Sequence, residues 1–143
     1  MKHVDSLKKI KVCPFCNFKN DRILFENKTA FLTYSLAPYH KYHLLVIPKR
    51  HVEYLKDLTP EENIDTMLLF VSAIKSLDKI GHNDCTIVMR DGKSLGKSVK
   101  HLHYNIIPGG EIGDFSINAK ARKLLTKKEE DSLTKELKKI IKI

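Results

Sequence analysis

Residues 98–108 alternate polar and apolar side chains, and this alternation predicts a β-strand over residues 99–108. Because successive side chains of a strand point to opposite faces, His101, His103 and Asn105 share one face. The other face carries the side chains that we expect to pack on a core, namely Leu102, Tyr104 and Ile106. The strand therefore presents two imidazoles and an amide together at a surface or in a cleft.

The remaining apolar runs predict an antiparallel sheet. Four of them have the length and composition of strands and lie at residues 22–26, 29–33, 43–47 and 85–89. The first two form a predicted hairpin with a tight turn at Asn27-Lys28, and Pro48 ends the third. We expect the fourth to be the neighbour of the strand over residues 99–108.

Two segments predict helices. Residues 59–80 begin with Thr59 as a cap and Pro60 at the first helical position, and Gly81 suits the C-terminal end. Apolar residues recur at helical spacing in this segment: Ile64, Met67, Leu68, Val71, Ile74 and Leu77. Residues 126–143 predict a second helix with one apolar stripe. Antiparallel strands in series with one helix inserted between them indicate the α+β class rather than a parallel doubly wound fold.

Length and composition indicate one globular unit. A chain of 143 residues with 42% hydrophobic content can close one core, so we expect a single domain over residues 1–143, with a core at 13–110. No segment approaches the about 20 apolar residues that span a bilayer, and the three cysteines suit a reducing compartment. We therefore expect a cytoplasmic protein without a membrane partner.

The charge balance favours anionic partners. There are 26 Lys and Arg against 17 Asp and Glu, which gives a formal net charge of +9. Charge alone does not choose between nucleotides and nucleic acid. Much of the excess lies in the terminal segments, where a solvated helix face explains it equally well.

Cys13 and Cys16 are two residues apart, which is the spacing of half a zinc site. Two more ligands are needed, and His40 and His43 are candidates; a metal-free pair of buried thiols is the alternative. A redox pair of this spacing caps a helix, whereas residues 17–21 predict a turn. The sequence therefore favours a metal over redox chemistry.

The loop at residues 92–98 resembles a Walker-type phosphate loop only in composition. That motif has four residues between its glycines and a following helix, whereas Gly92 and Gly96 are separated by three and a strand follows. A flexible loop and a loop that contacts phosphate through its backbone amides both remain open.

The segment His101-Leu102-His103-Tyr104-Asn105-Ile106-Ile107 resembles the His-φ-His-φ-His-φ-φ signature of the histidine triad (HIT) family, with Asn105 in place of the third histidine. Residues 44–51 resemble the family's strand that ends in Ile-Pro-Lys-x-His, and residues 57–62 resemble its helix start. The resemblance implies a five-stranded antiparallel sheet with two main helices, usually paired as a homodimer.

The same resemblance implies hydrolysis or transfer at the α-phosphate of a nucleotide. His103, at the middle position, is the expected nucleophile, since a neutral imidazole attacks phosphorus near pH 7 and the bond can be broken again. The backbone carbonyl of His101 is expected to fix its tautomer. Ser98 and Lys97 are expected to donate to the non-bridging phosphate oxygens, and Asn105 to keep a hydrogen bond to phosphate.

The resemblance also implies a nucleotide site and a zinc site. Phe15, Tyr34 and Leu36 align with residues that flank the base; Ser35 stands where an acid meets the ribose, and Arg90 stands where a loop Asn is usual. Lys97 replaces a usual Gln, and with Arg90 it raises the positive charge near a phosphate chain. A structural zinc ion would be held by Cys13, Cys16, His51 and His101.

Three functions follow as hypotheses. The leading one is a nucleotide hydrolase or nucleotidyltransferase that acts on a dinucleoside polyphosphate, a nucleoside phosphoramidate or a nucleotide sugar, and Asn105 favours transfer. The second is a catalytically weak nucleotide-binding or regulatory protein, because of Ser35 and Asn105. The third is a nucleic-acid end-processing protein attracted by the basic termini.

Overall fold

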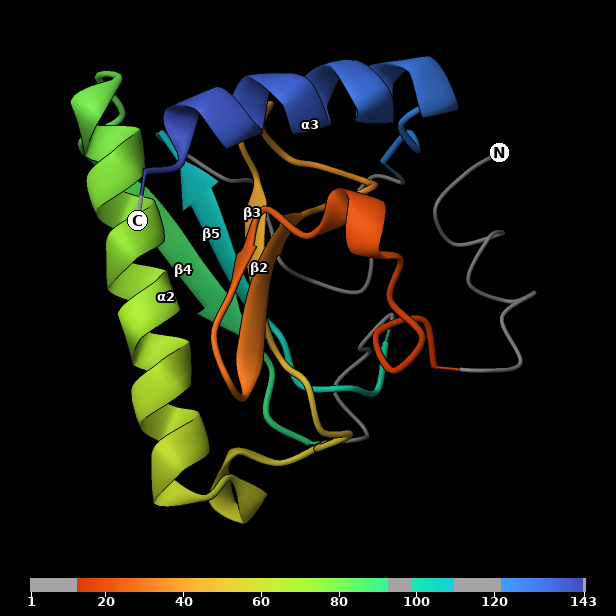
Figure 1. The fold of residues 1–143 in the computed structure, drawn as a ribbon, viewed down its shortest axis with the longest axis vertical. Helices are drawn as coiled ribbons and strands as arrows, with labels where there is room; N and C mark the ends of the chain where they lie inside the picture. Colours follow the sequence, from red (N-terminus) through yellow and green to blue (C-terminus); the bar gives the residue numbers. More distant parts are fainter. Residues whose placement is uncertain (1–12, 93–98, 110–121, 143) are drawn as a thin grey trace.

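The computed structural model describes residues 13–92, 99–109 and 122–142. Five strands form one antiparallel sheet in the order β1-β2-β3-β5-β4, and two helices, α2 and α3, pack against it (Figure 1). The strands are β1 (Phe25–Glu26), β2 (Ala30–Tyr34), β3 (Leu44–Pro48), β4 (Cys85–Met89) and β5 (Tyr104–Pro108). The predicted α+β class, sheet and helix number are confirmed.

Helix α2 spans Pro60–Lys79 and helix α3 spans Lys127–Ile140. Each begins with a capping box, in which a threonine accepts from the backbone of a glutamate three residues later and the glutamate side chain accepts in return. Gly81, at φ +93°, lies just beyond the end of α2, where a left-handed conformation favours glycine. Short 3-10 turns at Asn20–Arg22 and Leu55–Asp57 precede β1 and α2.

The core lies between the sheet and the two helices. Alternate residues of the central strands, such as Leu32, Val46 and Ile106, pack there against Leu77 of α2 and Leu137 of α3. Figure 1 shows α2 along this side of the sheet and α3 across one end of it. The opposite side of the sheet carries the other alternate residues, and the segment after Cys13 covers part of it.

Two predictions need correction. Strand β5 begins at Tyr104 rather than at residue 99, because the preceding backbone leaves the sheet and Leu102 donates its N–H to the carbonyl of Val52 at 2.6 Å. Strand β1 has two residues rather than five, because Asn20–Arg22 forms a 3-10 turn. His101 and His103 thus precede the strand that they were predicted to belong to.

Helix α2 is also less simply amphipathic than its apolar spacing indicates. The residues that face the sheet are Leu69, Phe70, Ala73 and Leu77, whereas part of the predicted apolar stripe is exposed to solvent: Ile64, Met67, Leu68 and Val71. Neither helix of the described residues is long and apolar enough to cross a membrane.

Candidate functional site

The ring of His103 is held in one tautomer. Its Nδ1 lies 2.8 Å from the backbone carbonyl of His101, and since a carbonyl oxygen only accepts, Nδ1 carries the hydrogen. The lone pair of the neutral ring therefore lies on Nε2. The edge of Phe15 packs against this ring, with the ring centroids 5.2 Å apart. In this tautomer the half-buried imidazole can act chemically as a nucleophile through Nε2.

Asn105 is turned toward His43, a buried histidine for which the sequence suggested only a role as a metal ligand. Its Oδ1 lies 2.9 Å from Nε2 of His43, and its Nδ2 donates to the carbonyl of Val88 at 3.0 Å. The backbone N–H of Tyr39 donates to Nδ1 of His43, so that Nε2 of His43 is the donor to Asn105. His43 thus ties the loop before β3 to β5.

Burial keeps His43 uncharged. The side chain is 1% exposed, and this desolvation lowers its pKa from 6.5 to about 4, against the opposite effect of its hydrogen bond to Asn105. The positive charge of Arg122 adds to the lowering. A neutral His43 serves here as a fixed hydrogen-bond donor. No local sequence pattern indicates this pair, because it depends on which strands are neighbours.

Cys13, Cys16, His51 and His101 converge on one point. One ligand atom from each lies within 4.8 Å of all the others. The His101 Nδ1 is 3.5 Å from both sulfurs, and the His51 Nδ1 is 3.2 Å from the Cys16 sulfur. In a tetrahedral zinc site with Zn–S of about 2.3 Å and Zn–N of about 2.1 Å, sulfur and nitrogen are about 3.5 Å apart. The donor atoms therefore fit a tetrahedral metal ion, and this cluster can hold one.

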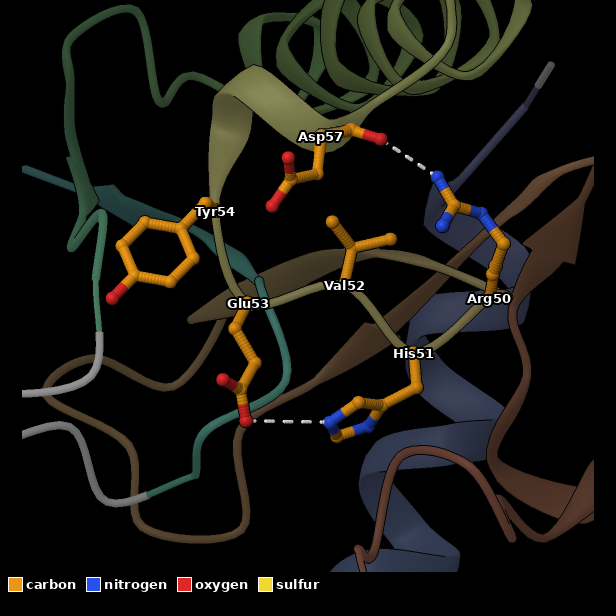
Figure 2. Close-up of a pocket in the computed structure, with 6 residues that line it drawn as sticks. All are labelled: Arg50, His51, Val52, Glu53, Tyr54 and Asp57. Atoms are coloured by element: carbon orange, nitrogen blue, oxygen red, sulfur yellow. Dashed lines mark hydrogen bonds and ion pairs between the residues drawn. The ribbon is translucent and has the colours of Figure 1, made fainter.

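Both histidines of the cluster point a lone pair at its centre. The Nε2 of the fully buried His101 donates to the carbonyl of Pro48 at 2.7 Å, which leaves Nδ1 unprotonated. The Nε2 of His51 lies 3.5 Å from the Glu53 carboxylate (Figure 2). Partners of this kind on the outer nitrogen orient metal-binding histidines in proteins.

The Cys16 thiol is costly to ionise without a cation. Desolvation of its sulfur and the neighbouring Cys13 raise the pKa of Cys16 to about 11. A thiolate is the form that binds metals, and a bound cation lowers the pKa of its thiol ligands. The paired cysteines are thus better suited to a metal than to free thiolate chemistry.

An open hollow of about 540 Å³ lies beside this cluster. Figure 2 shows its lining, which comes entirely from one loop: Arg50, His51, Val52, Glu53, Tyr54 and Asp57. Arg50 is engaged on one side, where it donates to the Asp57 carbonyl and to the Glu62 carboxylate of α2. The hollow shares only His51 with the predicted site residues, and we assign it no role.

Of the three residues predicted to flank a base, Phe15 alone contacts the His103 ring. Tyr34 is 1% exposed and lies in the core, where its hydroxyl is 2.7 Å from that of Thr134, and its contact with a base stays a prediction. Leu36 is half-buried and packs against the same core. Tyr34 and Leu36 lie on the side of the sheet that the helices cover, because the even-numbered residues of this segment point to that side.

The remaining predicted residues lie around the same open face or outside the described residues. Ser35 is buried on the face of β2 opposite Tyr34, and its hydroxyl accepts the N–H of Ala37 at 3.2 Å. Met89, the last residue of β4, pairs with Tyr104, the first residue of β5, and Arg90 and His103 directly adjoin this pair in the sequence. Lys97 and Ser98 lie outside the described residues, so their predicted contacts with phosphate stay predictions.

Comparison with known proteins decides the family. A family model described as HIT domain matches residues 18–112, which is more than half of the chain. The chain belongs to the HIT domain family. The geometry agrees with this family: His101 and His103 directly precede β5, an inner strand of the sheet, and the His101 carbonyl accepts from His103.

Curated relatives of this HIT protein include named nucleotide hydrolases. The bis(5'-adenosyl)-triphosphatase of Dictyostelium discoideum is 32% identical over 123 residues, which are 85% of this chain and 81% of the relative. The nitrilase and fragile histidine triad fusion protein NitFhit of Caenorhabditis elegans is 36% identical over 108 residues, 73% of this chain. That match covers only 24% of the fusion protein, so the HIT chain spans about a quarter of it.

Solved structures agree on the fold. The C. elegans NitFhit structure superposes with a TM-score of 0.71 at 27% identity, over 86% of this chain and 28% of that one. A hypothetical histidine triad nucleotide-binding protein from Sulfolobus tokodaii superposes with a TM-score of 0.69 at 23% identity. The match covers 90% of this chain and 91% of that one. A zinc-bound histidine triad family protein from Mycobacterium smegmatis superposes with a TM-score of 0.65 at 22% identity. The match covers 89% of this chain and 93% of that one.

Proposed function

We propose that this HIT protein is a nucleotide hydrolase or nucleotidyltransferase that acts at an α-phosphate through a covalent nucleotidyl-His103 intermediate. The observation that carries the proposal is the hydrogen bond from Nδ1 of His103 to the His101 carbonyl, which leaves the Nε2 lone pair for attack. Relatives named bis(5'-adenosyl)-triphosphatase and bis(5'-nucleosyl)-tetraphosphatase support dinucleoside polyphosphates as the substrate class.

The reaction takes two displacements. In the first, Nε2 of His103 forms a bond to the α-phosphorus, the bond from phosphorus to the leaving group breaks, and the leaving group takes the electron pair. In the second, water or another acceptor attacks the same phosphorus, the P–N bond breaks, and the acceptor loses a proton. Splitting the reaction in this way replaces one difficult step with two easier ones.

We propose that Asn105 takes the third triad position and acts as a positioning residue. Both ends of its amide are engaged, with His43 and with the Val88 carbonyl, so its support for catalysis is to hold β5 and the segment before it in register. Because neither Asn105 nor His43 supplies a proton near neutral pH, the pair favours leaving groups that depart without taking up a proton.

We propose that the metal cluster holds a structural zinc ion. Two thiolates and two imidazoles are a donor set typical of closed, tetrahedral zinc sites, which leave no coordination position for substrate. The M. smegmatis protein of the same fold is described as zinc-bound. Such an ion would fix the side chain of His101, whose backbone carbonyl orients His103. Zinc would thus act on the nucleophile only through the position of His101.

We further propose that residues 1–143 form a single domain that pairs as a homodimer. The support is an apolar surface of α2, made by Ile64, Met67, Leu68 and Val71, together with the unpaired edge of β4, whose Ile87 is 48% exposed. An exposed apolar patch of this kind next to a free strand edge favours association with a second copy.

A nucleotide-binding protein with weak catalysis is the second candidate. The observation that favours it is Ser35, whose hydroxyl is buried and bonded to the backbone of Ala37. A serine engaged in this way is a poor substitute for a carboxylate that binds both ribose hydroxyls. This candidate predicts nucleotide binding without turnover. Nothing in the described geometry favours the nucleic-acid alternative over either candidate.

The covalent intermediate can be tested directly. The protein is mixed with diadenosine triphosphate and its intact mass is measured at short times, with release of adenosine monophosphate followed in parallel. We expect a transient adduct of one nucleotidyl group on the wild-type protein, and neither adduct nor turnover with His103→Ala.

His82→Ala is the matched control, since His82 contacts the His40 and Tyr42 rings and lies outside the proposed site. It is expected to keep both adduct and turnover. Turnover by His103→Ala at the wild-type rate would refute the intermediate, whereas binding without any turnover by the wild-type protein would favour the second candidate.

A further inference from the structure

Arg122 reaches the functional face from the segment that precedes α3, a part of the chain for which the sequence suggested no role. Its Nη1 donates to the Ala37 carbonyl at 2.6 Å, and its guanidinium carbon lies 3.9 Å from the centroid of the Tyr39 ring. Both partners belong to the loop between β2 and β3. These contacts fix the plane of the guanidinium group and leave its other N–H donors available for a ligand.

A continuous series of contacts connects Arg122 with the nucleophile. The Tyr39 ring that supports Arg122 lies 5.8 Å from the His43 ring, and Tyr39 also donates its N–H to His43. His43 is bonded to Asn105, and the charges of Arg122 and of a protonated His103 both act on it. Arg122 and the proposed nucleophile therefore lie near the same buried histidine.

Arg122 is a half-buried cation for which the described residues supply no counter-ion. In the described part of the chain no ion pair includes it, and the nearby charge of Arg90 is of the same sign. Burial, which is the larger effect, and Arg90 both lower its pKa when no anion is bound. A charge in this position is costly unless it is paired, and the flat, forked guanidinium matches a phosphate group.

We propose that Arg122, with Arg90, binds the phosphate groups on the leaving side of the substrate, so that the protein selects nucleotides whose α-phosphate is joined to a further phosphate. This inference rests on the proposed function and names its leaving group. Arg90 directly follows the Met89–Tyr104 pair of the sheet, and its charge acts on Arg122, so the two cations are close enough to bind one chain of phosphate groups.

The chemistry of the first step explains the selectivity. When Nε2 of His103 bonds to the α-phosphorus of a dinucleoside polyphosphate, the P–O bond to the β-phosphate breaks and that oxygen gains a negative charge. A fixed guanidinium stabilises this charge and no proton is needed. With a phosphoramidate the P–N bond breaks and the departing amine takes up a proton, so there is no new negative charge for Arg122 to stabilise.

The test compares two substrates with different leaving groups. Diadenosine triphosphate and adenosine 5'-phosphoramidate are offered separately to the wild-type protein and to Arg122→Gln. We expect the variant to lose about ten- to a hundredfold in kcat/KM for the triphosphate, in line with the loss of a charged hydrogen bond. The value for the phosphoramidate is expected to change by less than about twofold, since its leaving group makes no such bond.

Arg22→Gln is the matched control, because Arg22 is also half-buried and stacks on an aromatic ring, that of Phe18, at 4.5 Å. It is expected to leave both substrates unaffected. An equal loss for the two substrates with Arg122→Gln would show that Arg122 only supports the fold, and no loss for either would remove it from the site.

A binding measurement separates this inference from the proposed function. Calorimetry with inorganic triphosphate requires no turnover, and we expect the wild-type protein to bind it at least about tenfold more tightly than Arg122→Gln does. The wild-type protein could bind triphosphate more tightly than Arg122→Gln does and yet turn over neither substrate. That result would support the anion site and contradict the proposed catalysis. If the wild-type protein does not bind triphosphate, the inference is overturned.

Discussion

At the scale of single residues, His101 joins the two chemical parts of the protein. Its Nδ1 faces the two cysteine sulfurs, while its backbone carbonyl accepts from His103. The sequence predicted both roles, because the spacing of the two histidines matched a known signature. It did not predict His43 as the partner of Asn105, since 62 positions separate the two residues and only the strand order brings them together.

The metal cluster is testable at this scale. Protein purified without chelator is expected to hold about one zinc ion per chain, and Cys16→Ser to hold much less, because the sulfur supplies one of four ligands. Metal analysis measures the content. A chelator is expected to lower the melting temperature of the wild-type protein and to leave that of Cys16→Ser nearly unchanged.

Cys85→Ser is the matched control, because Cys85 lies in β4 and does not belong to the cluster. It is expected to keep the metal and the response to chelator. Wild-type protein without metal, or an equal loss of metal from both cysteine variants, would contradict the zinc proposal.

At the scale of elements, the N-terminus of α2 depends on one carboxylate. Glu62 is 5% exposed, completes the capping box with Thr59, and accepts from Arg50 at 2.7 and 3.2 Å. The pKa of Glu62 is lowered from 4.5 to about 2, mainly by its hydrogen bond from the Arg50 guanidinium. The hydrogen bonds from Thr59 lower this pKa further. The ion pair thus fixes the segment that follows His51 against the start of the helix.

Acid is expected to remove this contribution. Because the folded-state pKa of Glu62 is depressed, its stabilisation is fully present above about pH 4.5 and is lost as the pH falls toward about 2. We expect Glu62→Gln to lower the free energy of unfolding by about 1–3 kcal/mol at pH 7. Urea denaturation from pH 7 to pH 3 measures it, and the difference from wild type is expected to shrink across the acid limb.

Glu61→Gln is the neighbouring control, because Glu61 pairs with Lys28 at the surface, where ion pairs contribute little. It is expected to change the unfolding free energy only slightly at any of these pH values. A constant difference between Glu62→Gln and wild type down to pH 3 would contradict the assignment of the low pKa.

At the scale of the whole molecule, the fold covers its two sheet faces differently. Both helices lie on one face, which leaves the other to the metal cluster, the triad residues and Arg122. The exposed apolar residues of α2 lie on the side of the helix away from the sheet, and β4 is an edge strand of the described sheet. The proposed site and the proposed dimer contact therefore occupy different parts of the protein.

Leu68→Lys tests the dimer. Leu68 is 59% exposed in the single chain, so the change is expected to leave the fold intact and to place a charge in the contact between two copies. Sedimentation velocity is expected to give a dimer for the wild-type protein and a monomer for the variant. Phe25→Lys, which alters an exposed apolar residue at the opposite edge of the sheet, is expected to remain dimeric.

A monomeric wild-type protein would contradict the proposed contact, and so would a dimer that both variants retain. Loss of the dimer in Phe25→Lys alone would move the contact to the β1 edge of the sheet.

The sequence by itself predicted the fold class, which the structure confirms, and it named the four residues of the metal cluster and the proposed nucleophile. These depend on local alternation, on capping residues and on short motifs, which are properties of neighbouring residues. The tertiary structure decided that β5 begins only at Tyr104, that Tyr34 lies in the core, and that His43 and Arg122 approach the site. Those features depend on strand register and on loop packing between distant segments, and no local pattern encodes which residues will meet.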